Sequence, residues 1–452
     1  MSNLINDDLA TLDLFSGCGG LSLGFAEAGF LLKAHIEKEE TALSTLVSNL
    51  HGGNLNGVAI EHDIANVENP KEFICNSGVK DVKIILGGPP CQAYSLVGRA
   101  KLNSLGSNEK AYLQDARGNL FLQYLRFVKE LLPEVIIMEN VPESMAYGKR
   151  NIPEEMCKQL DLLGYKSRYT VINAASFGVP QYRERMILIS YRDDVGKIPE
   201  FPKASYCLGS SIKYRQNLSS VAGSVNFEHA VFTPLLDKGR RAVNSYEAIG
   251  DLPFISYFPK TVNICEGSNS LLPYGTDAQN EFQKMMRVHG GYTSSYVANN
   301  LIRYTKRDFP IFNRMKEDDT YPEAVRIATQ LRNEYIKDNN IEIDDDKIRE
   351  LDKQFIPPYP VDSFQSKWRV LSKDKPSHTV LAHLGVDTYS HIHYDAMQAR
   401  GISVREAARL QSFPDSFIFP SNMKHAFVEI GNAVPPLLAY NIALQIRSQL
   451  GI

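Results

Sequence analysis

The sequence offers neither a leader nor a membrane span. Its first ten residues, MSNLINDDLA, contain no basic residue and no apolar core, which argues against a secretory signal. No uninterrupted apolar run approaches the roughly 20 residues that a membrane-spanning helix needs. We therefore expect a cytoplasmic protein with no membrane partner.

Cysteine is scarce and follows no recognisable pattern. The six cysteines lie without a Cys-x-x-Cys pair or another spacing that is typical of a metal site, so we expect reduced thiols and no metal. A strong charge of one sign is missing too, since the formal net charge is −3 with 22% charged residues. That balance favours no particular partner, although it can conceal a local basic patch.

Strand-like and helical runs alternate through the first 195 residues. The strand-like runs are 10–17, 31–37, 83–88, 134–141, 166–174 and 185–192, and the clearest helical runs are 20–29 and 38–50. This alternation predicts an α/β fold with a doubly wound, mostly parallel sheet. Ligands of such a sheet bind at the carboxyl ends of its strands.

The middle of the chain has a different composition. Residues 196–316 show weak periodicity and hold 15 Lys and Arg against 9 Asp and Glu. Basic residues beside aromatics, as in 237–246 and 299–310, are typical of a nucleic-acid surface, although a solvated irregular domain explains the modest bias as well. Residues 317–355 predict one or two acidic helices that face away from any polyanion, and 356–360 predict a linker.

The end of the chain is compact again. Residues 403–417 predict a short amphipathic helix closed by Pro414, and 431–450 predict a turn followed by an apolar helix. The last helix needs a core that covers its apolar face, so we expect it to pack on the first domain. The length of 452 residues fits two or three domains. We expect a catalytic domain at 1–195, a second domain with a hinge at 196–420, and a returning segment at 421–452.

A glycine-rich turn, DLFSGCGGLSLGF at 13–25, follows the first strand and opens a helix. Its glycines allow close backbone approach, and the helix start offers free amides. Alone, such a turn is shared by dinucleotide enzymes and methyltransferases, or is only a tight connection. Glu37 ends the second strand, where it can accept hydrogen bonds from ribose hydroxyls, and Asp63 can receive an adenine amino group. Together these residues predict an adenosine site that does not require a pyrophosphate.

A stiff loop leads to a single thiol. The stretch GGPPCQAYS at 87–95 follows a buried strand, and its prolines fix φ and remove amide donors before Cys91. A thiolate is a strong nucleophile wherever nearby positive charge or helix amides lower its pKa. Most cysteines are inert and buried, but the rigid setting at a strand end favours a nucleophile here.

Two charged motifs accompany further strands. Glu139 in VIIMENVP leaves an apolar strand, where a carboxyl in a closed site can stay protonated and act as an acid or donor. Arg183 and Arg185 stand two apart on the same side of a strand start, and inward guanidiniums need an anion or a carbonyl as partner. The alternatives are an ionised surface glutamate and arginines that pair with strand neighbours.

The motifs, in their order and at their distances, resemble those of the cytosine-5 DNA methyltransferase family of the prokaryotic restriction-modification type. They are DLFSGCGG, GGPPCQAYS, ENV, QYRERM, RVLSKDKPSHTVLAH, REAARLQSFPD and GNAVPP. The resemblance covers the chain from end to end except 196–365, the variable target-recognition segment of this family. It implies the Rossmann-like fold of S-adenosylmethionine-dependent methyltransferases with a second, smaller, irregular target-recognition domain.

The resemblance also implies a reaction and its partners. Cys91 would add to C6 of a cytosine flipped out of double-stranded DNA, and the methyl group of S-adenosyl-L-methionine would move to C5. Glu139 would contact N3 and the exocyclic amine, Arg185 would hold O2, and Arg183 would brace the cysteine loop. From family habit we expect a monomer that modifies bacterial or phage DNA, with a restriction endonuclease as its functional partner.

Two further sets of residues follow from the same resemblance. The cofactor-binding set is Phe15, Gly17, Gly19, Gly20, Leu21, Glu37, Asp63, Ile64, Gly88, Pro89, Leu120, Asn432, Ala433 and Val434. The DNA-binding set is Gln92, Ser95, Arg99, Lys101, Arg240, Arg241, Arg303, Lys306 and Arg307. We interpret 95–118 as a lid over DNA, with Arg99 and Lys101 meeting phosphates.

Four alternatives compete with this interpretation. A nicotinamide oxidoreductase would not need PPCQ or QYRER, and GCGG lacks the third, spaced glycine of the dinucleotide pattern. A thiol hydrolase would need a histidine oriented toward Cys91, and the histidines at 378–393 show no matching signal. A tRNA methyltransferase on the same frame stays the main alternative, although the large, partly basic recognition segment favours duplex DNA. A catalytically dead relative is disfavoured because every expected catalytic residue is present.

Overall fold

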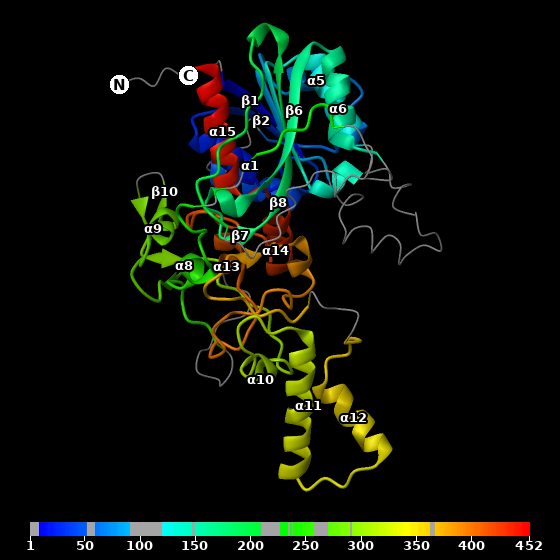
Figure 1. The fold of residues 1–452 in the computed structure, drawn as a ribbon, viewed down its shortest axis with the longest axis vertical. Coiled ribbons are helices and arrows are strands. Elements are labelled where there is room, and N and C mark those ends of the chain that lie inside the picture. Colours follow the sequence, from blue (N-terminus) through cyan, green and yellow to red (C-terminus); the bar gives the residue numbers. More distant parts are fainter. Residues whose placement is uncertain are drawn as a thin grey trace. The chain divides into compact units, whose positions relative to one another are not determined.

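The computed structural model describes residues 9–51, 59–90, 120–146, 150–208, 227–233, 236, 238–256, 270–289, 292–361 and 367–452. The chain forms two compact units (Figure 1). Unit 1 comprises Met1–Ala242 and Ala433–Ile452, and unit 2 comprises Val243–Asn432. These boundaries lie further along the chain than those expected after 195 and 420, and a target-recognition domain at 196–420 stays a prediction.

Residues after 195 remain in unit 1 because their backbone bonds to it. Ala230 forms a parallel bridge with Tyr169, and the Val231 amide donates to the Tyr169 carbonyl at 2.8 Å. Further on, the Cys207 amide donates to the Arg240 carbonyl at 2.7 Å. An isolated sequence does not reveal such pairings, because they join segments far apart along the chain.

The centre of unit 1 is a seven-stranded sheet in the order β3-β2-β1-β4-β5-β8-β6. Its strands are β1 (Ala10–Leu14), β2 (Leu31–Glu37), β3 (Ala59–Glu61), β4 (Ile84–Gly87), β5 (Val135–Asn140), β6 (Tyr165–Asn173) and β8 (Glu184–Arg192). Only β8 runs antiparallel to its neighbours β5 and β6, which confirms the predicted mostly parallel α/β fold. The chain winds from β1 toward β3 and then from β4 in the other direction, so a switch point lies between β1 and β4.

Helices cover both faces of this sheet (Figure 1). One apolar cluster joins the sheet to α5 (Leu120–Leu131) and α6 (Ile152–Leu162), through side chains such as Phe127 and Met156. The other joins it to α1 (Gly20–Glu27) and α15 (Pro436–Leu450). Within the described residues, the other α-helices of unit 1 are α2 (Glu40–Leu50) and α3 (Pro70–Asn76).

The last helix packs closely on the first. A Cβ placed on Gly24 of α1 would lie 2.5 Å from the Ala439 Cβ and from the Pro436 carbonyl oxygen of α15. Only glycine permits this approach. The C-terminal helix is thereby buried along Leu438, Ile442 and Ile446, as its apolar face requires.

One apolar stretch, Met423–Leu450, is long enough in principle to cross a membrane. It consists of two helices, α14 (Met423–Asn432) and α15, rather than one continuous span. The 15 residues of α15 rise only about 22 Å, which is short of the hydrocarbon core. Burial against α1 explains the apolar face of α15 without a membrane.

Unit 2 consists mainly of short helices. The one or two helices predicted at 317–355 are present as two, α11 (Tyr321–Asp338) and α12 (Asp345–Phe355). The helix predicted at 403–417 ends earlier, as α13 (Val404–Leu410), because Ser412 adopts a left-handed φ of 66°. The others are α8 (Ser245–Ile249), α9 (Glu281–Arg287), α10 (Phe309–Phe312) and α14, none of which the sequence patterns revealed.

Candidate active site

The turn after β1 adopts a conformation that most residues avoid. Phe15, Gly17 and Gly19 have φ of 60°, 55° and 92°, all in the left-handed region. The Gly19 amide closes the turn by donating to the Ser16 carbonyl at 3.0 Å. A Cβ on Gly17 would meet no atom within 4 Å, so this side of the turn is open to a ligand. Gly20 and Leu21 begin α1 directly behind it.

Glu37 ties the end of β2 to this turn. Its Oε2 accepts from the Gly17 amide at 2.8 Å, while Oε1 accepts from the Lys38 and Glu39 amides at 2.8 and 2.9 Å. A carboxylate offers about four acceptor positions, so three bonds orient Glu37 and leave capacity for a hydroxyl group of a ligand. The predicted pair of glycine turn and strand-end carboxylate is therefore brought together.

Asp63 and Ile64 follow β3, at the same edge of the sheet. Asp63 caps a 3₁₀ turn at Ile64–Asn66 by accepting from the Ala65 amide at 3.0 Å. The Ile64 side chain is buried in the apolar cluster that also contains Val67. The structure thus assigns both residues a local structural role, in addition to any contact with an adenine.

The carboxyl end of β5 meets the start of β8. Because the two strands are antiparallel, with Glu139 opposite Ile187, the side chains of Glu139 and Arg185 come within reach of each other. The Arg185 Nε lies 2.7 Å from the Glu139 Oε1, and both side chains are 12% exposed. The two residues form a largely buried ion pair at the edge of the sheet, where a ligand can contact it.

The loop after β4 is held beside this pair. A Cβ on Gly88 would lie 3.2 Å from Glu139 Oε2, and the Asn140 Nδ2 donates to the Pro89 carbonyl at 3.2 Å. The tie of Asn140 to the proline loop is a role that the sequence patterns did not reveal. The chain beyond Pro90 carries the predicted residues Cys91, Gln92, Ser95, Arg99 and Lys101, which lie outside the described residues.

Arg183 does not join Arg185 at the ion pair. Its side chain is buried, and its Nη2 donates to the Ala433 carbonyl at 3.0 Å. This bond connects the QYRERM motif with the GNAVPP motif inside unit 1, and Val434 is buried in the cluster around α15. Asn432 ends α14 in unit 2, and Leu120 begins α5.

The predicted DNA-binding arginines differ in exposure and in how far other groups occupy their guanidinium groups. In unit 1, Arg240 and Arg241 are exposed, and the Arg240 guanidinium lies 5.0 Å from the Tyr206 ring centre. In unit 2, Arg303 donates to the carbonyls of Leu384 and Gly385, which occupies part of its guanidinium.

The two basic residues that follow Arg303 differ in the same way. Arg307 lies 2.6 Å from Asp308, so much of its charge is neutralised by that carboxylate. Lys306 is exposed beside them. Lys306 is accordingly better placed than Arg307 to meet a phosphate.

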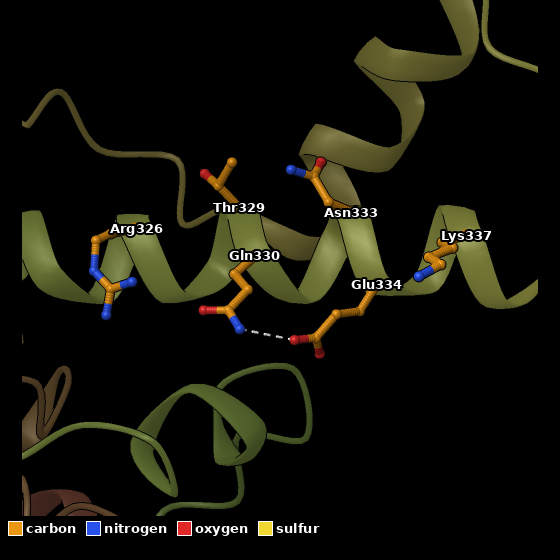
Figure 2. Close-up of a pocket in the computed structure, with 6 residues that line it drawn as sticks. All are labelled: Arg326, Thr329, Gln330, Asn333, Glu334 and Lys337. Atoms are coloured by element: carbon orange, nitrogen blue, oxygen red, sulfur yellow. Dashed lines mark hydrogen bonds between the residues drawn. The ribbon is translucent and has the colours of Figure 1, made fainter.

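A hollow on the surface of α11 lies apart from all these residues in the sequence. Figure 2 shows the side chains that line it, with Gln330 donating to Glu334 at 2.9 Å. The lining residues are Arg326, Thr329, Gln330, Asn333, Glu334 and Lys337. All six come from one helix with mixed charge and none belongs to a predicted site, so we assign this hollow no catalytic role.

One polar residue of β1 was also missed. Asp13 is buried within an otherwise apolar strand, and the Ser22 Oγ lies 2.5 Å from its Oδ2. The signal in the sequence was a charged residue inside the apolar run ATLDL. Burial raises the pKa of Asp13 to about 7, a change that the Ser22 bond opposes and that repulsion from Glu37 reinforces.

Residues 9–448 match the family model of C-5 cytosine-specific DNA methylases. The chain belongs to this family. It shares 42% identity over 446 residues with M.OihORF3336P, a candidate type II methyltransferase of Oceanobacillus iheyensis, covering 97% of this chain and 95% of the relative. It is 28% identical to the type II methyltransferase M.Bpa9945I of Bacillus paralicheniformis, with 97% and 98% of the two chains covered.

Solved structures agree on the fold. A crystal structure of a candidate DNA modification methyltransferase encoded within an E. coli prophage superposes with a TM-score of 0.64 at 21% identity, covering 98% of this chain and 100% of that one. The protein is thus a DNA (cytosine-5)-methyltransferase by family. The match to this family does not favour the tRNA methyltransferase, the oxidoreductase or the hydrolase alternative.

Proposed function

We propose that this methyltransferase uses Cys91 as its nucleophile, with Glu139 and Arg185 as the groups that bind the target cytosine. The observation that carries the proposal is the 2.7 Å ion pair of Glu139 and Arg185 beside Gly88, at the edge of the sheet. Asn140 holds the Pro89 carbonyl next to this pair, and Cys91 follows two residues later. The loop and the ion pair are therefore parts of one site.

The two charged groups match the edge of a cytosine. Addition of a thiolate at C6 places negative charge on the ring, which a guanidinium at O2 stabilises electrostatically. A carboxylate at the same edge accepts a hydrogen bond from the exocyclic amine, and in its protonated form it donates one to N3. Arg183 acts indirectly. It donates a hydrogen bond to the Ala433 carbonyl and so fixes the C-terminal segment that supports the site.

The cofactor in this proposal is S-adenosyl-L-methionine, which supplies the methyl group when bound. The turn at 15–20 fits it through the open side of Gly17 and the free acceptor capacity of Glu37. Asp63 at the end of β3 lies at the same edge for the adenine, with one carboxylate oxygen committed to the Ala65 amide. The switch point between β1 and β4 is the place where such folds bind nucleosides.

The biological setting is the modification half of a restriction-modification system. Support comes from the relatives, which are named as type II methyltransferases. The substrate is double-stranded DNA, the working form is a monomer, and the site of action is the cytoplasm, where bacterial DNA lies. The exposed Arg240, Arg241 and Lys306 are the described basic residues best placed to meet phosphates.

The test is covalent trapping on DNA whose cytosines carry fluorine at C5. Fluorine cannot leave as the C5 proton does, so the proposed mechanism leaves a protein–DNA adduct that survives denaturation when S-adenosyl-L-methionine is present. Cys91→Ser should abolish the adduct, while Cys75→Ser, at an exposed free cysteine, should leave it unchanged. An adduct with fluorinated tRNA but not with varied duplex DNA would move the substrate to RNA, and no adduct with either would overturn the nucleophile.

A further inference from the structure

Four polar side chains form a continuous hydrogen-bonded chain beneath the glycine turn. Asp13 lies on β1, Ser22 on α1 and His35 on β2, and His51 follows the last residue of α2. The Ser22 Oγ lies 2.5 Å from Asp13 Oδ2 and 3.0 Å from His35 Nδ1. The His35 Nε2 lies 3.0 Å from the His51 Nε2. The chain therefore joins the elements on both sides of the proposed cofactor turn.

The chain runs from the interior toward the surface. Asp13, Ser22 and His35 are buried, whereas His51 is partly exposed. The Asp13 Oδ1 is buried with no hydrogen-bond partner among the described residues. A buried carboxylate with an unsatisfied oxygen is costly in its charged form, so this atom points to a group that the ligand-free protein lacks.

The titratable groups around Asp13 favour its neutral form in the ligand-free protein. Glu37 on β2 repels a charge on Asp13, and the phenol of Tyr124 on α5 lies close enough to interact with it. Burial, together with repulsion between the rings' charged forms, lowers the pKa of His35 to about 3, and burial also lowers the pKa of His51. Both imidazoles are therefore neutral at physiological pH, and each can donate from one nitrogen and accept at the other.

The bonds can run in either direction. With Asp13 ionised, Ser22 donates to Asp13, His35 Nδ1–H donates to Ser22, and His51 Nε2–H donates to His35. With Asp13 protonated, each bond reverses, and His51 keeps its proton on Nδ1. Every group has a partner in both arrangements, so one proton can pass between Asp13 and the surface without breaking the chain.

We propose that Asp13 carries a proton in the ligand-free protein and releases it through Ser22, His35 and His51 when the positively charged methyl donor binds. This inference rests on the proposed function, which places S-adenosyl-L-methionine, a sulfonium cation, at the turn. A cation near Asp13 favours the ionised carboxylate. The proton leaves Asp13 Oδ2 for Ser22, each group passes one proton to the next, and His51 Nδ1 gives one proton to water, so the protons balance.

Titration calorimetry of the unmodified protein tests this directly. Binding of S-adenosyl-L-methionine in two buffers of different ionisation enthalpy counts the protons released. A group that titrates near pH 7 is half protonated there, so about half a proton should be released per donor bound at pH 7. The affinity should be about tenfold weaker at pH 6 than at pH 8, because binding favours the ionised form. S-adenosyl-L-homocysteine, which lacks the positive sulfur, should release fewer protons and depend less on pH.

Variants separate the relay from simple structural damage. Asp13→Asn keeps the shape of the side chain but cannot titrate, so it should abolish both the proton release and the pH dependence of affinity. Ser22→Ala removes the bond that lowers the pKa of Asp13, so the pH dependence should move to higher pH. Asp194→Asn, at an exposed carboxylate of unit 1, is the matched control and should change neither quantity.

The outcomes distinguish this inference from the proposed function. Equal affinity at pH 6 and pH 8 for the unmodified protein, or unchanged proton release in Asp13→Asn, would overturn the relay and leave the cofactor site standing. If Asp13→Asn does not fold, equal proton release by the two ligands on the unmodified protein would overturn it as well. Failure of the unmodified protein to bind the donor at any pH would overturn the proposed cofactor site and the relay with it.

Discussion

The two units of the chain are stabilised by different interactions. In unit 1, apolar side chains cover both faces of a seven-stranded sheet. In unit 2, the described strands have two residues each, and three arginines are buried in addition to an apolar cluster around Trp368. Arg400, Arg405 and Arg409 are almost completely buried there. A segment without a large sheet can thus be organised by charged groups, provided that each of them has partners.

Arg409 in unit 2 and Asp13 in unit 1 differ in how completely a buried charged group is paired. Arg409 lies 2.6 Å from both oxygens of Asp415 and 3.0 Å from Asp251. In unit 1, by contrast, Asp13 has a buried oxygen without a partner among the described residues. Satisfied buried charges specify a fold, whereas an unsatisfied one marks a place where a ligand completes the structure.

The largest effect is expected from Arg409→Met, which removes the central cation of unit 2. Asp415 would then be buried without its main partner, and Asp251 would keep only Arg287, at a cost of about 3–5 kcal/mol in the free energy of unfolding. Trp368 is the single tryptophan and is buried in unit 2, so its fluorescence in a urea titration reports on this unit. Arg409→Lys keeps the charge but not the forked geometry of the guanidinium. Its free energy of unfolding should therefore lie between those of the unmodified protein and Arg409→Met.

The matched control for this change lies on the exposed surface of α11. Arg326→Met also removes a guanidinium, but one whose partner Glu323 is solvated, so the Trp368 transition should not move. If Arg409→Met were as stable as the unmodified protein, the contrast between the two units would be wrong.

The different interactions also explain which parts could be predicted from the sequence. Glu37, Glu139 and Arg185 were found because apolar runs mark strands, and the ends of strands converge at one edge of a sheet. The correct strand order is enough to bring these side chains to the same edge of the sheet. The packing of α15 on unit 1 was expected on similar grounds, because an apolar helix face requires a core, but its close contact with α1 was not.

The interior of unit 2 could not be predicted in this way. The stretch REAARLQSFPD has the pattern of an amphipathic helix with solvated arginines, yet Arg405 and Arg409 are buried. Their partners include Asp251 and the carbonyl of Ala298, which lie more than 100 residues earlier in the chain. No local period encodes such pairs. Likewise, the Asp13 network depends on His51, which no motif connects with the turn.

An intermediate effect on stability is expected from Gly24→Ala in unit 1. The added Cβ would lie 2.5 Å from the backbone and the Cβ of α15, so the two helices must move apart at a cost of about 1–3 kcal/mol. The loss should appear in the far-ultraviolet circular dichroism transition, while the Trp368 transition of unit 2 should stay in place. A shift of both by the same amount would show that the units do not unfold separately. Ser448→Ala, at an exposed position of α15, is the control and should leave both transitions nearly unchanged.

A smaller effect on stability, with a larger one on activity, is expected from Asn140→Ala. The change removes one hydrogen bond to the Pro89 carbonyl, which is worth about 1 kcal/mol. Because that bond positions the loop before Cys91, kcat should fall on the order of tenfold or more through misplacement of the thiol. KM for the methyl donor should hardly change, since the turn at 15–20 is intact. A normal kcat would show that the prolines alone position the loop.

The smallest effect is expected at a histidine of unit 1 that is paired with two carboxylates and belongs to none of the predicted site residues. The His229 side chain lies 2.9 Å from Glu154 and 2.8 Å from Asp161, so it holds the segment at 227–233 against α6. Burial lowers the pKa of His229, but the hydrogen bonds to the two carboxylates outweigh this and leave the pKa raised.

A histidine whose pKa is higher in the folded than in the unfolded protein stabilises the fold at pH values below the unfolded-state pKa, which is near 6.5. This stabilisation is lost as the pH rises through the folded-state pKa. The difference in unfolding free energy between the unmodified protein and His229→Gln should therefore shrink from pH 5.5 to pH 8.5. The change should amount to a few tenths of a kcal/mol, because solvent screens the partly exposed Asp161. His425→Gln in unit 2, at a histidine that bonds Asn422, provides the baseline. A difference that grows with pH would mean that His229 is neutral when folded and that the segment at 227–233 is held by its backbone bonds alone.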